Sequence, residues 1–129
     1  MTTVEVTTVE PRLNPPGDLE YAQALLDVVV DRQASDVVLL DLTQLTTFTD
    51  YFVIATVDNI RQARAIEEAV SDAAAKRGQK AKVEGAPEDG WILVDAGDGI
   101  FVHLFSLEAR VYYDLEGLWH RAQEIVRVQ

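Results

Sequence analysis

The chain has no cysteine among its 129 residues, which excludes disulfide bonds and thiolate metal sites. It also lacks any apolar run that approaches the roughly 20 residues of a membrane span. The first residues include Glu5 and Glu10 without an apolar segment, which argues against a secretory signal peptide. With Arg12 as the only nearby base, they also argue against an organelle transit peptide. These absences predict a cytoplasmic protein without a membrane contact.

Basic side chains are scarce. Eleven Lys and Arg residues face 22 Asp and Glu residues, which gives a formal net charge of -11 at pH 7, and the longest basic run is Lys76-Arg77. Nucleic-acid binders attach to phosphates through Lys and Arg, so we do not expect direct nucleic-acid binding as the main contact. The acidity has two interpretations: it keeps the protein in solution, or it steers the protein to a basic protein partner.

The usual signatures of catalysis are absent. The sequence has no phosphate-binding glycine loop, no nucleophile elbow and no zinc-binding H-E-x-x-H pattern. His103 stands in an apolar segment, where a hydrogen-bonded histidine is more common than a metal ligand. Asp95 and Asp98 suit a tight turn better than a divalent cation, although either use is chemically reasonable. We therefore expect no catalytic residue, no cofactor and no metal site.

Residues 1–17 have the composition of a tail. They contain Thr, Glu and three of the four prolines, with neither a helical nor a strand period. We expect this stretch to be a disordered N-terminal tail. The length of the remainder, residues 18–129, suits a single domain with one core.

Hydrophobic periodicity predicts the elements of that domain. In the first half, Asp18 and Asp58 are the candidate N-caps of two helices, and Gly78 is the candidate residue that ends the second. In the second half, a turn at 96–99 joins two strands, and Ser106 can cap a helical region that runs with breaks towards the C-terminus. The predicted segments are a helix to about residue 34, strands at 36–42 and 50–56, a helix at 59–77, a short strand at 80–84, a loop at 85–90, and strands at 91–95 and 100–105.

This order predicts an α/β fold, in which a mixed β-sheet of about five strands is flanked by helices. The helix after residue 56 permits a parallel crossover, whereas the hairpin at 91–105 is antiparallel. The consecutive apolar residues of 36–42 and 50–56 indicate strands that are buried on both faces.

Aromatic residues gather near the C-terminus, interleaved with Asp95, His103 and Arg110. If Asp95 pairs with Ile100 in the hairpin, Trp91 and Asp95 share one sheet face and His103 lies on the other. Trp, Tyr and Arg dominate interface hot spots, but aromatics also fill cores, and the pattern leaves both roles open for each residue. The aromatics are Trp91, Phe101, Phe105, Tyr112, Tyr113 and Trp119.

Several of these segments together resemble one family, the ribosomal silencing factors, also called Iojap-like proteins. The similarity runs in order through about residues 18–119 and is specific as a set. The segments that carry it are Asp50-Tyr-Phe-Val-Ile-Ala-Thr56, Asn59-Ile-Arg-Gln62, Glu84-Gly85, Gly90-Trp-Ile-Leu-Val-Asp-Ala-Gly-Asp98, Val102-His-Leu-Phe105, Arg110-Val-Tyr-Tyr113 and Leu115-Glu-Gly-Leu-Trp119.

The resemblance implies a fold related to the nucleotidyltransferases and a function without catalysis. It implies binding to ribosomal protein fourteen, a basic protein of the large ribosomal subunit, near the face that meets the small subunit. Occupation of that site blocks subunit joining and represses translation, and the family is also associated with late large-subunit assembly. Carried over to this chain, the docking surface comprises Trp91 as first anchor, with Asp95, His103, Arg110, Tyr113 and Trp119.

Two further hypotheses compete with this one. The first is an active nucleotidyltransferase or nucleotide-binding protein, which needs a Gly-Ser turn and closely spaced carboxylates for metal; the chain has neither a Gly-Ser dipeptide nor an Asp-x-Asp motif. The second is an assembly factor that forms a homodimer through an exposed sheet edge.

Overall fold

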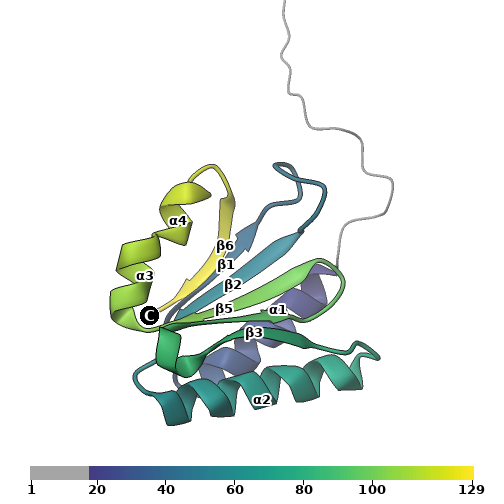
Figure 1. The fold of residues 1–129 in the computed structure, drawn as a ribbon. Coiled ribbons are helices and arrows are strands. Elements are labelled where there is room, and N and C mark those ends of the chain that lie inside the picture. Colours follow the sequence, from purple (N-terminus) through teal and green to yellow (C-terminus); the bar gives the residue numbers. More distant parts are fainter. Residues whose placement is uncertain (1–17) are drawn as a thin grey trace, which may run out of the picture.

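One mixed sheet of six strands organises residues 18–129, the part of the chain that this computed structural model describes (Figure 1). The strand order is β3-β4-β5-β2-β1-β6. The central pair, β2 and β5, is parallel, and the other neighbouring pairs are antiparallel. The predicted fold class, a mixed sheet flanked by helices, is confirmed, although the sheet has one strand more than expected. The predicted N-terminal tail lies outside the described residues.

The elements follow the predicted order up to residue 118. The helices are α1 (Leu19–Asp31), α2 (Ile60–Lys76), α3 (Leu107–Tyr113) and α4 (Leu115–Leu118), and a 3₁₀ turn, η1, covers Pro87–Asp89. The strands are β1 (Ser35–Asp41), β2 (Tyr51–Thr56), β3 (Lys82–Ala86), β4 (Trp91–Asp95), β5 (Ile100–Phe105) and β6 (Gln123–Val128). Within residues 18–129, no helix combines the length and the apolar character needed to cross a membrane.

The helix ends show how local sequence sets the boundaries. Asp18 caps α1 as predicted, since its Oδ1 accepts a hydrogen bond from the backbone N–H of Glu20 at 2.8 Å. The predicted cap of α2 is wrong by one residue: Asn59, not Asp58, accepts from the N–H of Gln62 at 2.8 Å. Gly78 follows α2 with a φ of 82°, which confirms its predicted place in the left-handed region.

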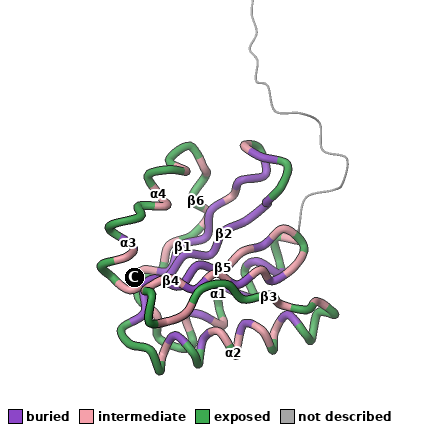
Figure 2. Tube along the Cα trace, in the orientation of Figure 1, coloured by how far each residue is buried: buried purple, intermediate pink, exposed green. Residues whose placement is uncertain are grey.

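The two faces of the sheet are covered unequally (Figures 1 and 2). Helices α1 and α2 lie along one face and enclose the main core, in which Leu25, Leu39 and Ile66 are fully buried. On the opposite face, α3 and α4 cover a smaller core around Phe52 and Phe105. Strands β1 and β2 contribute to both cores, as their unbroken apolar runs predicted.

The predicted C-terminal helical region is wrong beyond α4. Residues 123–128 form β6, which pairs antiparallel with β1 at the edge of the sheet. The β-branched residues Ile125, Val126 and Val128 favour a strand, and pairing with β1 stabilises this strand where a helix was predicted. The short strand predicted at 80–84 lies at 82–86 instead, so that the first two residues of the predicted loop belong to β3 and η1 follows at Pro87–Asp89.

The hairpin register also differs from the prediction. Asp95 pairs with Phe101, not with Ile100. The backbone N–H of Ala96 donates to the carbonyl oxygen of Ile100 at 2.9 Å, so the loop has three residues, Gly97, Asp98 and Gly99, all with positive φ. The shift by one residue places His103 on the same face as Trp91 and Asp95, because side chains alternate along a strand.

Candidate functional site

Trp91, at the start of β4, is the centre of an aromatic cluster on the sheet face opposite α1 and α2. Its ring centroid lies 4.9 Å from that of Phe105, 5.9 Å from that of His103 and 4.8 Å from that of Tyr113. Tyr113 comes from α3 and lies over Trp91 with 49% of its surface exposed. The half-buried indole therefore supports an aromatic side chain that reaches solvent.

His103 lies beneath this cluster and is nearly inaccessible to solvent. Its Nδ1 accepts a hydrogen bond of 3.2 Å from Nε1 of Trp91. An indole N–H can only donate, so Nδ1 is unprotonated and the proton of the neutral ring is on Nε2. Nε2 has no hydrogen-bond partner among residues 18–129. Burial lowers the pKa of His103 to about 3, so the ring is neutral at physiological pH.

Asp95 shares the sheet face of Trp91 but lies at the other end of β4. Its Oδ1 accepts a hydrogen bond of 3.0 Å from the backbone N–H of Gly97, and the neighbouring Asp98 accepts one of 3.2 Å from Gln79. This geometry agrees with the turn interpretation of both aspartates. Residues 18–129 contain no group of three or more His, Asp or Glu side chains that could hold a metal ion.

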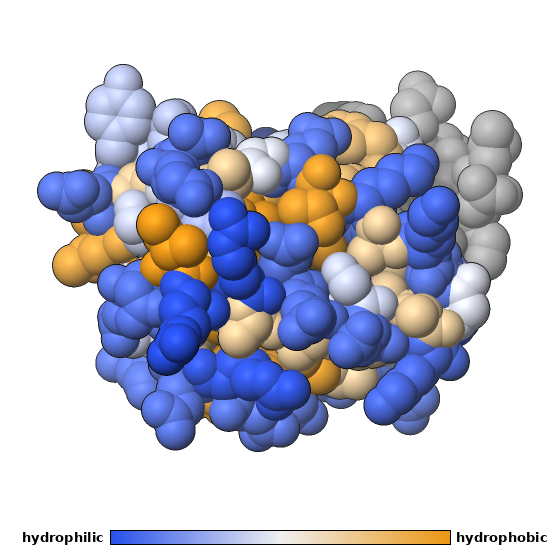
Figure 3. Space-filling model, turned by 60° about the horizontal axis from the view of Figure 1, so that its bottom comes forward, coloured by the Kyte–Doolittle hydropathy of each residue, from blue (hydrophilic) through white to orange (hydrophobic). Residues whose placement is uncertain are grey.

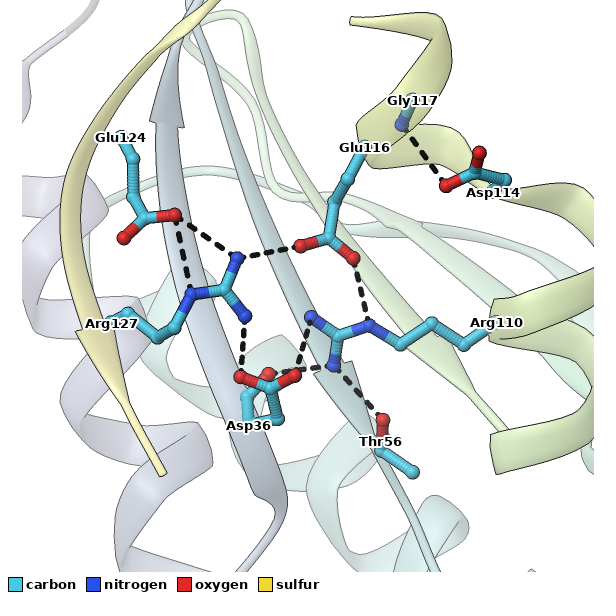
Figure 4. Close-up of polar contacts among 8 residues, drawn as sticks. All are labelled: Asp36, Thr56, Arg110, Asp114, Glu116, Gly117, Glu124 and Arg127. Carbon is cyan, nitrogen blue, oxygen red and sulfur yellow. Dashed lines mark hydrogen bonds and ion pairs between the residues drawn. The ribbon is translucent and has the colours of Figure 1, made fainter. Parts of the chain in front are cut away.

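Arg110 of α3 points into the protein (Figure 4). Its Nη1 donates to the carbonyl oxygen of Asp36 at 2.6 Å and to the hydroxyl of Thr56 at 2.9 Å, while Nε donates to Glu116 at 3.0 Å. Only 8% of its side chain is exposed. These contacts fasten α3 to β1 and β2, which is a structural role; a direct role of Arg110 in docking stays a prediction.

Arg127 of β6 extends this network towards the sheet edge. It donates to Glu116 at 2.8 Å and to Asp36, so that both carboxylates lie between the two guanidinium groups (Figure 4). Burial acts to raise the pKa of Glu116, but the hydrogen bonds from Arg110 and Arg127 outweigh it and hold that pKa below its ordinary value. The network therefore joins α3, α4, β1 and β6.

Trp119 follows α4 and lies half-buried over the sheet. Its ring meets that of Phe52 edge to face, with the centroids 6.2 Å apart. Of the six predicted docking residues, the structure brings Trp91, His103 and Tyr113 into one cluster. Asp95, Arg110 and Trp119 lie outside it, although all six belong to the side of the sheet that α3 and α4 cover only in part.

The comparison with known proteins identifies the family. The family model described as "Ribosomal silencing factor during starvation" matches residues 15–129. The chain belongs to the ribosomal silencing factor family. The resemblance deduced from the motifs is thereby confirmed, and membership supports a ribosome-associated role in silencing translation.

Individual relatives agree with this assignment to the family. The chain is 38% identical to the ribosomal silencing factor RsfS of Bacillus subtilis over 108 residues, which covers 83% of this chain and 88% of that protein. It is 33% identical to the chloroplastic protein Iojap of Arabidopsis thaliana over 83% of this chain and 44% of that protein. It is 30% identical to a mouse protein named mitochondrial assembly of ribosomal large subunit protein 1, over 89% of this chain and 54% of that protein.

Solved structures show the same fold. A crystal structure of a Chromobacterium violaceum protein superposes on this chain with a TM-score of 0.73 at 32% identity, covering 79% of this chain and 85% of that one. A Bacillus halodurans structure gives a TM-score of 0.69 at 30% identity, covering 87% of this chain and 99% of that one. Neither comparison tests the predicted relationship to the nucleotidyltransferases, which stays a prediction.

The sequence analysis did not name Leu107, Val111 and Leu118, which are among the most exposed apolar residues of the described part of the chain. Leu107, Val111 and Tyr112 of α3 are 66%, 73% and 80% exposed, and Leu118 of α4 is 71% exposed. Leu107 and Val111 are four residues apart and share one face of the helix, a signal that was readable in the sequence. The α2 side, in contrast, is largely hydrophilic with small separate apolar areas (Figure 3). Exposed apolar side chains that adjoin one another mark interaction sites more often than scattered ones.

Proposed function

We propose that this silencing factor binds the large ribosomal subunit through its basic ribosomal protein fourteen and sterically blocks joining with the small subunit. The observation that carries the proposal is the exposed apolar and aromatic surface of α3, held over Trp91, on a protein whose net charge is -11. We call the surface made by Leu107, Val111, Tyr112 and Tyr113 the α3 surface.

The chemistry of the α3 surface suits recognition of a protein. Tyr113 is a half-exposed aromatic side chain with few rotatable bonds, which is typical of interface hot spots. The acidic charge of the whole chain favours encounter with a basic protein and disfavours direct binding to ribosomal RNA. The name of the mouse relative connects that protein with assembly of the large subunit, which supports the same choice of subunit here and a part in late assembly.

A steric block requires no catalysis, and we propose that the protein acts without it, in the cytoplasm. His103 would be a poor general base because it is buried and its Nδ1 already accepts a hydrogen bond from Trp91. The competing nucleotidyltransferase hypothesis has no supporting observation among the described residues. Titration calorimetry with nucleotide and magnesium tests it directly, and measurable heat of binding would revive it.

Sedimentation of ribosomal subunits tests the proposal. Purified large subunits are saturated with the protein, small subunits are added, and the fraction of joined ribosomes is measured. We expect the protein to sediment with large subunits and joined ribosomes to decrease. Normal joining by saturated large subunits would refute the steric block, whereas sedimentation with small subunits alone would refute the choice of partner.

A pair of variants locates the contact. Tyr113→Ala removes the exposed ring of the α3 surface and is expected to weaken binding by about 2 kcal/mol, as truncation of a hot spot does. Phe48→Ala is the matched control, because Phe48 is 72% exposed in the loop between β1 and β2. Equal affinities of the two variants for large subunits would show that the contact lies outside the α3 surface.

A homodimer remains a separate prediction. Strands β3 and β6 are the two edges of the sheet, and an open edge can pair with a second copy. Measurement of the mass in solution tests this: a monomer at working concentration would exclude the dimer and leave the ribosome proposal intact.

A further inference from the structure

A groove runs between η1 and α3, next to the Trp91 cluster. It has a volume of about 910 Å³. The η1 wall presents Glu88 and Asp89, and the α3 wall presents Leu107, Glu108, Val111 and Tyr112. The groove therefore combines three carboxylates with the most exposed apolar part of the α3 surface.

The charges of the groove have one sign. Among the described residues that line it, none is basic. Glu88 forms an ion pair of 3.4 Å with Arg64 outside the groove, but both side chains are more than half exposed, so this contact is easily exchanged. Glu108 and Asp89 are exposed. A ligand that enters this groove meets carboxylates on both walls and apolar side chains on the α3 wall.

We propose that this groove receives an extended segment of the partner protein in which Lys or Arg side chains alternate with apolar ones. The proposal rests on the proposed function and assigns the place and the chemistry of its contact. The long stems of Lys and Arg can lie along Leu107 and Val111 while their charged ends meet the carboxylates. The exposed ring of Tyr112 adds a face for a cation.

Other macromolecules fit this groove poorly. The phosphates of RNA and the anionic head groups of membranes would be repelled by Glu88, Asp89 and Glu108. An acidic peptide would be repelled by the carboxylates, and a neutral peptide would form no ion pair with them. Charge complementarity therefore selects a basic protein segment, and contacts with the apolar side chains fix its position in the groove.

Two variants of the full chain with equal net charge test the inference. The groove variant carries E88Q, D89N and E108Q. The control variant carries E67Q, E68Q and D72N on α2, so that each loses two glutamates and one aspartate. Circular dichroism and the unfolding midpoint establish that both are folded. Binding to purified large subunits is then measured at low and at physiological salt, together with binding to protein-free ribosomal RNA.

The groove variant is expected to bind large subunits about tenfold or more weakly, with a reduced salt dependence, while the control stays within about twofold of the unaltered chain. Tyr112→Ala is expected to weaken binding with an unchanged salt dependence. Equal losses in the two charge variants would overturn the inference, because net charge alone would then explain the effect. Binding to RNA alone as tight as that to subunits would also overturn it. Failure of the unaltered chain to bind large subunits would instead refute the proposed function.

Discussion

Acidification should destabilise this protein through His103 in particular. The pKa of the buried ring is lowered to about 3 in the folded state, whereas the ordinary value is 6.5. Between these values the unfolded chain binds a proton that the folded chain does not. The contribution of His103 to the free energy of unfolding is therefore fully present above pH 6.5 and is lost as the pH falls towards 3.

The magnitude follows from the ordinary pKa of the unfolded residue. At about pH 5 an unfolded histidine is almost fully protonated, which favours the unfolded state by about 2 kcal/mol relative to its neutral form. Each further pH unit adds about 1.4 kcal/mol until the folded pKa is approached. This figure is large against the total stability of a small domain, which is about 5–15 kcal/mol.

Urea unfolding at pH 7.5 and pH 5 measures the effect, and His103→Gln isolates it. Glutamine does not titrate and retains an oxygen that can accept from Nε1 of Trp91. The free energy of unfolding should fall by about 2 kcal/mol less in His103→Gln than in the unaltered chain. His120→Gln, which removes the other histidine, is the control and should retain the full loss. Parallel pH dependences of His103→Gln and the unaltered chain would refute the reasoning.

Further predictions concern packing, charge and association. Trp91→Ala should weaken binding to large subunits by roughly 2–4 kcal/mol in equilibrium titrations, because Tyr113 loses its support, whereas Trp91→Phe should stay within about 1 kcal/mol; equal affinities would show that the cluster does not serve docking. Arg110→Ala should cost about 1–3 kcal/mol of unfolding free energy in urea, since the buried hydroxyl of Thr56 and the carbonyl oxygen of Asp36 lose their donor; a loss below about 1 kcal/mol would contradict the role of the network. Gly85→Ala should lower stability by roughly 1–3 kcal/mol, because Gly85 has a φ of 83° and an added Cβ would collide with the carbonyl oxygen of Trp91; an unchanged thermal midpoint would refute this. Association with large subunits should slow as salt is added, in stopped-flow measurements, and a salt-independent rate constant would argue against steering.

Local signals determined most of the fold, and long-range pairing determined what the sequence analysis missed. Asp18 and Gly78 define helix ends through a local hydrogen bond and a positive φ, respectively, and both positions were predicted correctly. The strand at 123–128 was predicted as a helix because its pairing partner, β1, is distant from it in the sequence. The hairpin register was wrong by one residue because three residues with positive φ, not four loop residues, make the turn.

The prediction of the docking residues was incomplete for the same reason, because it depends on contacts between residues that are far apart in the sequence. Composition alone identified Trp91 and Tyr113 as members of one aromatic group, and the structure brings their rings together. It gave no sign that Arg110 turns inward, since its acceptors on Asp36 and Thr56 are 74 and 54 positions away. The exposed stripe of α3 was readable from the spacing of Leu107 and Val111, but only the burial of Arg110 on the same helix shows which side faces water.

The contact between Asp36 and Arg127 spans 91 positions of the chain. A contact between segments so far apart in the chain brings no stabilisation until both segments have met. Formation of β6, and with it the contact of Arg127 with Glu116 of α4, should therefore be among the latest events in folding. Chains that have assembled the α1–α2 side of the sheet but not β6 would already be compact, yet Glu116 of α4 would still lack its contact with Arg127.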